Sequence, residues 1–293
     1  MTVSPCRKES PLESRYAIRP LQGDEVSLLL SWADEEGWNP GLDDARAFHA
    51  ADPDGFLVGE LDGEPIAGIS AVNYGGRYGF VGLYLVKPAW RGQGYGLALW
   101  QAAMDRLGTV ACGLDGVPAQ VENYRRSGFT YAYRQLRFAG PGGSDCGYVG
   151  AGIAPLQAEQ LPALLAYDAA VFGVAREAFL HAWLSMPGSA VFVAGDAGRI
   201  EGYAVLRPCR DGHKIGPLFA DDPATAQALF LACRGRAGAG PVFLDVSEAN
   251  GEAVQLAQRQ GLSVVFETAR MYRNGQPEFP VQRVYGVTSF ELG

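Results

Sequence analysis

A glycine-rich loop between a predicted strand and a predicted helix is the feature that most restricts how this chain can fold. Residues 80–86, Phe-Val-Gly-Leu-Tyr-Leu-Val, are apolar and β-prone, and the Lys-Pro that follows predicts a buried strand ending in a turn. A helix is predicted next by apolar residues at helical spacing, namely Leu97, Trp100, Met104 and Leu107. Gly108 is the expected C-cap of this helix.

The loop between the two elements, residues 91–96, is Arg-Gly-Gln-Gly-Tyr-Gly. Its glycines allow the backbone to approach a ligand closely, and the N–H groups at the start of the following helix favour an anion. Arg91 adds a fixed positive charge to the same place. The loop therefore predicts a binding site for a diphosphate group.

On these residues the chain resembles the GNAT N-acetyltransferase superfamily, whose acyl-CoA-binding loop has the pattern Arg/Gln-x-x-Gly-x-Gly/Ala between a strand and a helix. Arg91, Gly94 and Gly96 fit this pattern. A second match is residues 122–129, Glu-Asn-Tyr-Arg-Arg-Ser-Gly-Phe, which is similar to a later family segment with a tyrosine four residues before Gly-Phe. The distance between the two segments also agrees with the family, and a strand is predicted between them at 110–114.

The resemblance implies that acetyl-CoA is bound by the predicted strand and loop through Tyr84, Leu85, Val86, Arg91, Gly92, Gln93, Gly94, Tyr95 and Gly96. Backbone groups of Leu85 and Val86 would bind the pantetheine arm and polarise the acyl carbonyl. The acetyl group would pass directly to an amine without an acyl-enzyme, and Tyr124 would protonate the leaving sulfur. The alternative is that Tyr124 is only a structural aromatic on the buried face of a helix at 118–127.

The general base is not identified by the sequence. An aliphatic amine must lose a proton, and the candidates are Glu36, Glu122 and Asp115, or a water chain between them. Trp38 and Asn39 lie between two predicted helices, in a region that covers the acceptor site in this family. We therefore expect Glu36, Trp38 and Asn39 to contact the acceptor, with Trp38 as an apolar or cation–π wall. A turn with Trp38 packed in the core is the alternative.

The two halves of the chain share one pattern. Predicted hairpins at 56–69 and 190–205 each follow two helical segments and precede strand, helix, strand and helix. This pattern predicts an α/β fold, α+β in some schemes, with two tandem GNAT-like domains. Each would be a mixed, mostly antiparallel sheet with helices on both faces. The expected parts are a disordered tail at 1–14, a GNAT acetyltransferase domain at 15–139, a Gly-rich linker at 140–147 and a second GNAT-like domain at 148–293.

The second copy departs from the family pattern. It has Asp221 and Asp222, and no glycines, where the phosphate loop would lie, and Ala257 stands where the first copy has Tyr124. We therefore expect a degenerate second copy that does not bind CoA in the usual way, and a catalytic first copy. This pairing resembles the YitH-like tandem GNAT proteins, most distinctively in residues 35–41, Glu-Glu-Gly-Trp-Asn-Pro-Gly. The second copy could complete the acceptor pocket, hold a homodimer or support the first copy.

Composition restricts the remaining function classes. The formal net charge of −8 argues against nucleic-acid binding and mildly favours a cationic acceptor, a small-molecule or protein amine. Five cysteines without a C-x-x-C pair predict reduced thiols, with neither a disulfide framework nor a metal site. The sequence has no signal-peptide pattern and no apolar run of transmembrane length, so we expect a cytoplasmic protein without membrane contact.

Two other functions stay open on the sequence alone. A non-catalytic acyl-CoA sensor or interaction protein would bind the cofactor without turnover, and Tyr124 would be structural. A dinucleotide oxidoreductase fits the sequence less well. Its phosphate-binding turn has the pattern G-x-G-x-x-G, whereas the glycines between 92 and 96 follow Gly-x-Gly-x-Gly. The long loop with the bulky Trp90 also differs from a dinucleotide-binding turn.

Overall fold

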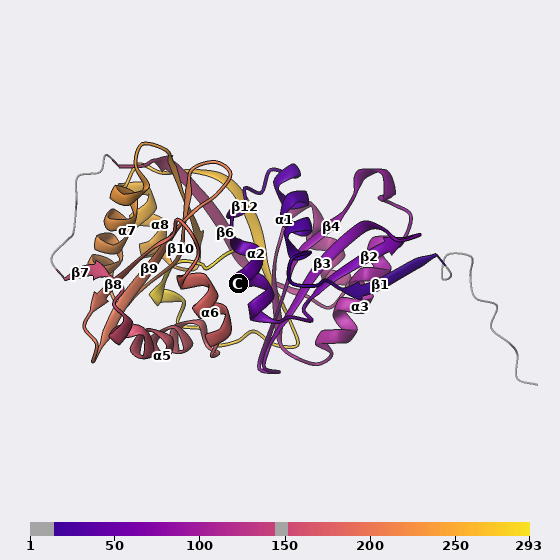
Figure 1. The fold of residues 1–293 in the computed structure, drawn as a ribbon, viewed down its shortest axis with the longest axis horizontal. Coiled ribbons are helices and arrows are strands. Elements are labelled where there is room, and N and C mark those ends of the chain that lie inside the picture. Colours follow the sequence, from indigo (N-terminus) through magenta and orange to yellow (C-terminus); the bar gives the residue numbers. More distant parts are fainter. Residues whose placement is uncertain (1–14, 144–151) are drawn as a thin grey trace, which may run out of the picture.

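The fold is taken from a computed structural model of the 293-residue chain, and the structure describes residues 15–143 and 152–293. Thirteen strands of these residues form one sheet in the order β1-β2-β3-β4-β5-β12-β6-β11-β10-β9-β8-β7, with β13 paired to β10 (Figure 1). Only two neighbouring pairs, β4 with β5 and β10 with β11, are parallel. The tail expected at 1–14 lies outside the described residues.

The helices and strands follow the same order in the two halves. The first half contains β1 Tyr16–Pro20, α1 Val26–Glu35, α2 Asp44–Ala51, β2 Phe56–Leu61, β3 Glu64–Tyr74, β4 Tyr78–Val86, α3 Tyr95–Leu107, β5 Cys112–Gly116, α4 Val121–Arg126 and β6 Thr130–Pro141. The second contains β7 Ile153–Pro155, α5 Leu161–Phe172, α6 Glu177–Leu184, β8 Ala190–Gly195, β9 Ile200–Pro208, β10 His213–Ala220, α7 Pro223–Ala237, β11 Pro241–Ser247, α8 Gly251–Arg259, β12 Ser263–Arg273 and β13 Val284–Gly286. The predicted fold class and the internal repeat are confirmed.

The two copies exchange their last long strand, which the sequence analysis did not anticipate. β6 of the first copy pairs with β11 of the second, and β12 of the second copy pairs with β5 of the first. β6 and β12 also pair with each other, so the two expected sheets are merged into one across the middle of the molecule (Figure 1). Backbone pairing therefore joins the copies, and neither half of the sequence contains a complete sheet of its own.

The strand exchange also moves the end of the first domain. Gly140 and Pro141, expected in the linker, lie in β6 and pair with Val242 and Pro241 of β11. Pairing with a neighbouring strand thus overrides the turn signal of a Gly-Pro sequence at this position. A Cβ added to Gly140 would come within 3.1 Å of the Leu262 side chain, so the glycine allows a close approach within the sheet.

Apolar side chains on both faces of the sheet explain the helix layers. On one face α1, α2, α5 and α6 share a core that runs across both copies, and Phe48 of α2 stacks on Trp183 of α6 with ring centroids 6.1 Å apart. On the other face α3 packs on the first copy, and α7 and α8 pack on the second. Among the described helices, none has the length and apolarity that a bilayer span requires.

Candidate active site

The two parallel strands of the first copy separate partway along their length. β4 and β5 pair only where Gly79–Val81 face Cys112–Leu114. Beyond this point β4 has a bulge, because Leu83 and Tyr84 together lie opposite one residue of β3, and Leu83 has a φ of 46°. A bulge bends its strand and breaks the ladder, which opens a V-shaped cleft between β4 and β5.

A cavity of about 600 Å³ lies in this cleft. Most of the residues predicted to bind the cofactor line it, namely Tyr84, Leu85, Val86, Arg91, Gly92, Gly94 and Gly96. The other two do not. Gln93 turns back and donates a hydrogen bond to the Ala89 carbonyl (3.0 Å), and the ring of Tyr95 packs on Tyr16 with centroids 4.9 Å apart. Four of the six loop residues therefore face the cavity, namely Arg91, Gly92, Gly94 and Gly96.

The loop before α3 has room for a ligand. Gly94 caps the helix with a φ of 92°, Gly92 has a φ of 75°, and a Cβ added at either would meet no atom within 4 Å. These left-handed positions favour glycine, and the helix N–H groups beyond them favour an anion. Leu97, predicted on the apolar face of α3, is instead 70% exposed and lines the cavity, because it lies at the edge of the buried face in the first turn.

Arg91 is fixed beside the same loop. Its Nε donates to the Val86 carbonyl (2.7 Å), and its guanidinium forms an ion pair with Glu36. Glu36, which we expected to contact the acceptor, lines the cavity but is held by this arginine. The pair places one positive and one negative group at the cavity mouth.

Tyr124 lies on α4 and lines the cavity. Its ring packs against Trp100 with centroids 5.4 Å apart, and a Cβ added to Gly116 would come within 2.2 Å of it. Burial, with a smaller contribution from Tyr84, raises the pKa of Tyr124 to about 12. Within the described residues its hydroxyl makes no hydrogen bond, so the group is packed, protonated at neutral pH and able to donate to a ligand in the cavity.

Two residues of the turn between α1 and α2 have different contacts: Trp38 faces the cavity, and Asn39 faces the second copy. Trp38 lines the cavity, and its carbonyl accepts hydrogen bonds from Arg137 (2.7 Å) and Lys214 (3.2 Å). Asn39, also expected at the acceptor, is absent from the cavity wall within the described part of the chain. Its amide bonds the backbone of Asp211 in the second copy, with N–O distances of 3.0 and 2.9 Å. Asn39 therefore joins the copies instead of facing the cavity.

Two of the proposed bases have other partners. Asp115 lines the cavity, but Arg270 binds both of its carboxylate oxygens at 2.7 Å. Arg270 reaches Asp115 because the exchanged strand β12 lies beside β5. Glu122 forms an ion pair with Arg125 on the exposed side of α4 and does not line the cavity in the described structure. Each of these two carboxylates is therefore already bound by an arginine.

Part of the cavity wall comes from the second copy, and its residues were not predicted from the sequence. Its residues are Phe266 and Thr268 of β12, together with Phe290 and Glu291 beyond β13. Arg137 of β6 lies at the same end and pairs with Asp245. No local pattern in the sequence marks these residues, because only the strand exchange brings them to β4. The second copy thus completes the cavity of the first.

Comparison with known proteins decides the family. Residues 24–129 match the acetyltransferase (GNAT) family, and residues 164–286 match an acetyltransferase (GNAT) domain. A holothin acyltransferase from Pseudoalteromonas sp. (strain SANK 73390) is 31% identical over 95% of this chain and 95% of its own length. The chain belongs to the GNAT acyltransferase family.

Solved structures share the tandem GNAT fold. A Pyrococcus horikoshii protein superposes with a TM-score of 0.80 at 22% identity, over 98% of this chain and 99% of its own. A tandem GNAT protein from the clavulanic acid biosynthesis pathway gives a TM-score of 0.59 at 14% identity, over 90% and 100%. At these identities the likeness concerns the fold alone.

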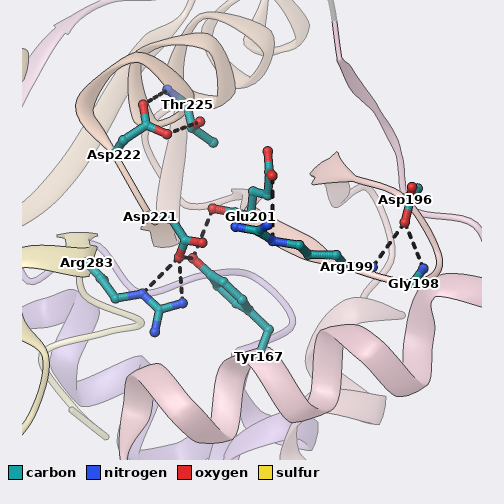
Figure 2. A network of polar contacts seen from close by, with 9 residues as sticks. All are labelled: Tyr167, Asp196, Gly198, Arg199, Glu201, Asp221, Asp222, Thr225 and Arg283. Atoms are coloured by element: carbon teal, nitrogen blue, oxygen red, sulfur yellow. Dashed lines mark hydrogen bonds and ion pairs between the residues drawn. The ribbon is translucent and has the colours of Figure 1, made fainter.

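The second GNAT copy has a carboxylate at the position of the glycine loop of the first copy. Asp222 caps α7, and one of its oxygens accepts hydrogen bonds from the N–H groups of Ala224 (2.8 Å) and Thr225 (3.0 Å), as Figure 2 shows in part. Hydrogen bonds from Thr225 lower the pKa of Asp222, and the bond from its backbone N–H contributes more than the bond from its hydroxyl. The helix end that faces the ligand cavity in the first copy is therefore satisfied by the protein itself here.

The cleft of the second GNAT copy is filled by β13. β10 and β11 pair over His213–Ile215 and then separate, as β4 and β5 do, but β13 pairs with β10 in the gap. The Val287 N–H just beyond β13 donates to the Asp245 carbonyl of β11 (2.8 Å). The side-chain amide of Asn250 binds the carbonyls at both ends of the turn before β13, those of Val281 (3.2 Å) and Val284 (3.0 Å).

An ion pair holds Arg283, the residue directly before β13. Arg283 donates from its Nε to Asp221 (2.9 Å), and the Tyr167 hydroxyl donates to the same carboxylate oxygen (3.1 Å) (Figure 2). Asp221 is therefore neutralised by Arg283 of the same chain, next to the helix end that Asp222 caps.

A buried lysine of the second GNAT copy gives a prediction on stability. Burial lowers the pKa of Lys214 from 10.5 to about 8, because only 4% of the residue is exposed. The unfolded chain binds this proton more tightly, so stability should rise with pH between about 8 and 10.5. We expect Lys214→Met to stabilise the protein by about 2–3 kcal/mol at pH 7, since Arg137 still satisfies the Trp38 carbonyl.

Urea unfolding at pH 7 and pH 10 measures this effect, with Lys87→Met as the control because the Lys87 side chain is 34% exposed. The gain from Lys214→Met should shrink at pH 10, where wild-type Lys214 is neutral in the folded state. A gain that is equal at both pH values, or that Lys87→Met reproduces, would show that burial of the charge is not its cause.

Proposed function

We propose that the first GNAT copy transfers an acetyl group from acetyl-CoA directly to a primary amine of a small molecule or protein, as a tandem protein of the YitH-like type. The observation that carries this proposal is the V-shaped cleft between β4 and β5, with a glycine loop at one end and Tyr124 in its wall. The non-catalytic sensor remains the alternative, and turnover separates the two.

The residues of the cleft suit the parts of acetyl-CoA. The open positions at Gly92 and Gly94, the N-terminus of α3 and the charge of Arg91 suit the pyrophosphate. The separated edge of β4 at Leu85 and Val86 offers backbone groups to the pantetheine arm and to the acyl carbonyl. The cavity of about 600 Å³ leaves room beyond the thioester for an acceptor.

Tyr124 supports the chemistry of the leaving group. When the amine nitrogen bonds the carbonyl carbon, the carbon–sulfur bond breaks and the sulfur gains negative charge. A phenol with a pKa of about 12 keeps its proton at neutral pH and donates a hydrogen bond to that sulfur. Full proton transfer to a free thiolate would be unfavourable, since ordinary thiols have a pKa of about 8.5. We infer that the same burial raises the basicity of the thiolate and so permits the transfer.

The second copy is proposed to bind no CoA. Asp222 at the start of α7 repels a diphosphate, and β13 lies where the pantetheine arm would lie in the equivalent cleft. These features support one acetyl-CoA site per chain. The relative that is named a holothin acyltransferase supports acyl transfer as the reaction and makes holothin a suitable acceptor for the first screen.

Calorimetric titration with acetyl-CoA tests the proposal, with NAD as the control ligand. We expect one site per chain, and about 100-fold weaker binding in the Arg91→Glu, Gly94→Trp variant, which adds repulsion and fills the open loop. An amine screen that includes holothin then measures release of CoA. Two equivalent sites would contradict the degenerate second copy, absence of binding would contradict the proposed function, and binding without turnover of any amine would favour the sensor.

A further inference from the structure

Five charged residues line the cavity, and four of them are already neutralised by ion pairs. Arg91 pairs with Glu36, Asp115 with Arg270 and Arg137 with Asp245. The fifth is Glu291, whose carboxylate forms no ion pair or hydrogen bond within the residues that the structure describes. The residue as a whole is only 6% exposed and lines the cavity, so its carboxylate is available to a ligand there.

Glu291 is held in the cavity by contacts at both ends of residues 287–293, which we call the crossing segment. At its start the Val287 N–H bonds Asp245 of the second copy, as described above. Near its end the Leu292 carbonyl accepts a hydrogen bond from the Tyr74 hydroxyl of the first copy (3.0 Å). Between them the Glu291 carbonyl lies 2.3 Å from where a Cβ of Gly82 would stand, so the segment packs tightly on β4.

Aromatic side chains and one unsatisfied hydroxyl lie at the same end of the cavity as Glu291. Phe266 and Phe290 lie together with ring centroids 6.5 Å apart, and Trp38 lines the same cavity. Thr268 also belongs to the cavity wall, and its hydroxyl is buried without a hydrogen-bond partner among the described residues. This end of the cavity therefore suits a small molecule with an apolar body and a hydrogen-bonding cationic group.

We propose that Glu291 is the general base of the reaction and that the acceptor is a small primary amine with an apolar body that is an ammonium ion in solution. The proposal rests on the proposed function. Glu291 takes one proton from the ammonium group, and the neutral nitrogen attacks the thioester carbonyl carbon. The carbon–nitrogen bond forms and the carbon–sulfur bond breaks. The nitrogen loses its second proton and the sulfur gains one, so the products are the amide, CoA thiol and one proton.

The charges around Glu291 agree with this role. The charged groups that interact with it include Arg137, Lys214 and Asp115. Asp245 binds two nitrogens of Arg137 (2.7 and 2.8 Å), and Arg270 binds Asp115. The Lys214 Nζ donates to the Trp38 carbonyl (3.2 Å) and is not bonded to Glu291 in the described structure. Among the described residues, Glu291 is therefore the cavity-lining carboxylate without a bonded partner, and it faces an incoming ammonium ion.

Glu291→Gln tests the proposal with two acceptor probes of similar shape. Benzylamine is an ammonium ion at neutral pH, whereas the amino group of O-benzylhydroxylamine is neutral and needs no base before it attacks. We expect kcat/KM for benzylamine to fall about 100-fold in Glu291→Gln, and kcat/KM for O-benzylhydroxylamine to change less than about threefold. Glu291→Asp should restore part of the benzylamine rate. Glu252→Gln on the surface of α8 is the matched control, and calorimetry checks that each variant binds acetyl-CoA like the wild type.

The outcomes separate this proposal from the proposed function. If Glu291→Gln lowered kcat/KM equally for both probes, Glu291 would be a structural residue. If it lowered kcat/KM for neither probe, Glu291 would have no part in the reaction. A wild-type protein that binds acetyl-CoA but does not acetylate benzylamine would overturn the assigned acceptor class. Failure to bind acetyl-CoA would overturn the proposed function itself.

Discussion

Replacing Tyr124 with Phe is expected to lower kcat by about 10–10³ while leaving the affinity for acetyl-CoA unchanged. The ring packs between Gly116 and Trp100, and Phe keeps these contacts. Only the hydroxyl is lost, and within the described chain it has no protein partner whose bond would break. A loss of rate would therefore come from the missing donor to the leaving sulfur, an interaction that matters once the carbon–sulfur bond breaks.

The pH dependence of kcat gives a second readout for Tyr124. Because burial raises its pKa to about 12, its proton stays in place across the range in which the protein can be assayed. We expect no alkaline fall of kcat from this group below about pH 11. An alkaline fall between pH 8 and 10 that disappears in Tyr124→Phe would show that the phenol has a lower pKa than its burial implies.

Steady-state kinetics with the best amine of the screen measures the effect, and Tyr131→Phe on the partly exposed strand β6 is the control. Tyr131 lies outside the cavity wall in the described structure, so its variant should keep the wild-type kcat. An unchanged kcat in Tyr124→Phe would remove the hydroxyl from the mechanism and leave Tyr124 as a packed aromatic of α4.

The parts of the fold and of the cavity wall that can be predicted from the sequence depend on neighbouring residues. Apolar runs and turn signals predicted the helices and strands, and the loop at 91–96 follows from glycine spacing at the start of a helix. In the second copy the absence of glycines and the presence of Asp221 and Asp222 predicted a different loop. Asp222 caps α7 there in the structure. In each case the residues that decide the conformation lie within a few positions of one another.

The parts that the sequence did not predict depend on contacts between distant strands. Asp115 is a plausible base in sequence, but Arg270 on the exchanged strand binds it. Asn39 looks like an acceptor contact until the second copy places Asp211 beside it. Glu291 shows no pattern around it, because its position depends on β13 entering the cleft of the second copy. Strand order is set by the whole sheet, so no local pattern contains it.

Arg270→Met is expected to destabilise the protein by about 3–5 kcal/mol, the range for removing one partner of a buried ion pair. The side chains of Arg270 and Asp115 are 6% and 0% exposed, and both carboxylate oxygens bind the guanidinium. Without Arg270 the buried Asp115 carboxylate loses the cation that binds both of its oxygens. Urea unfolding at pH 7 measures the loss, and Arg199→Met, which removes an exposed pair with Glu201, should cost about 0–1 kcal/mol.

The pH dependence of the free energy of unfolding shows why Arg270→Met destabilises the protein. Burial already raises the pKa of Asp115 despite the guanidinium beside it, and removal of Arg270 raises it further. A carboxyl group whose folded pKa lies above its unfolded value of about 3.9 favours folding at low pH and loses this contribution as pH rises. The deficit of Arg270→Met should therefore be largest near pH 7 and shrink toward pH 4. A deficit that does not change with pH would point to lost packing against Phe80 instead.

The double variant Arg270→Met, Asp115→Leu completes the test, because removing both partners leaves no buried charge and should recover most of the lost stability. This pair joins β5 of the first copy to β12 of the second, so its energy is shared by both copies. Since β6 and β12 are exchanged within one sheet, we expect a single unfolding transition in the wild type and in the double variant. Two separate transitions would mean that the copies fold independently, which would contradict a cavity wall built from both.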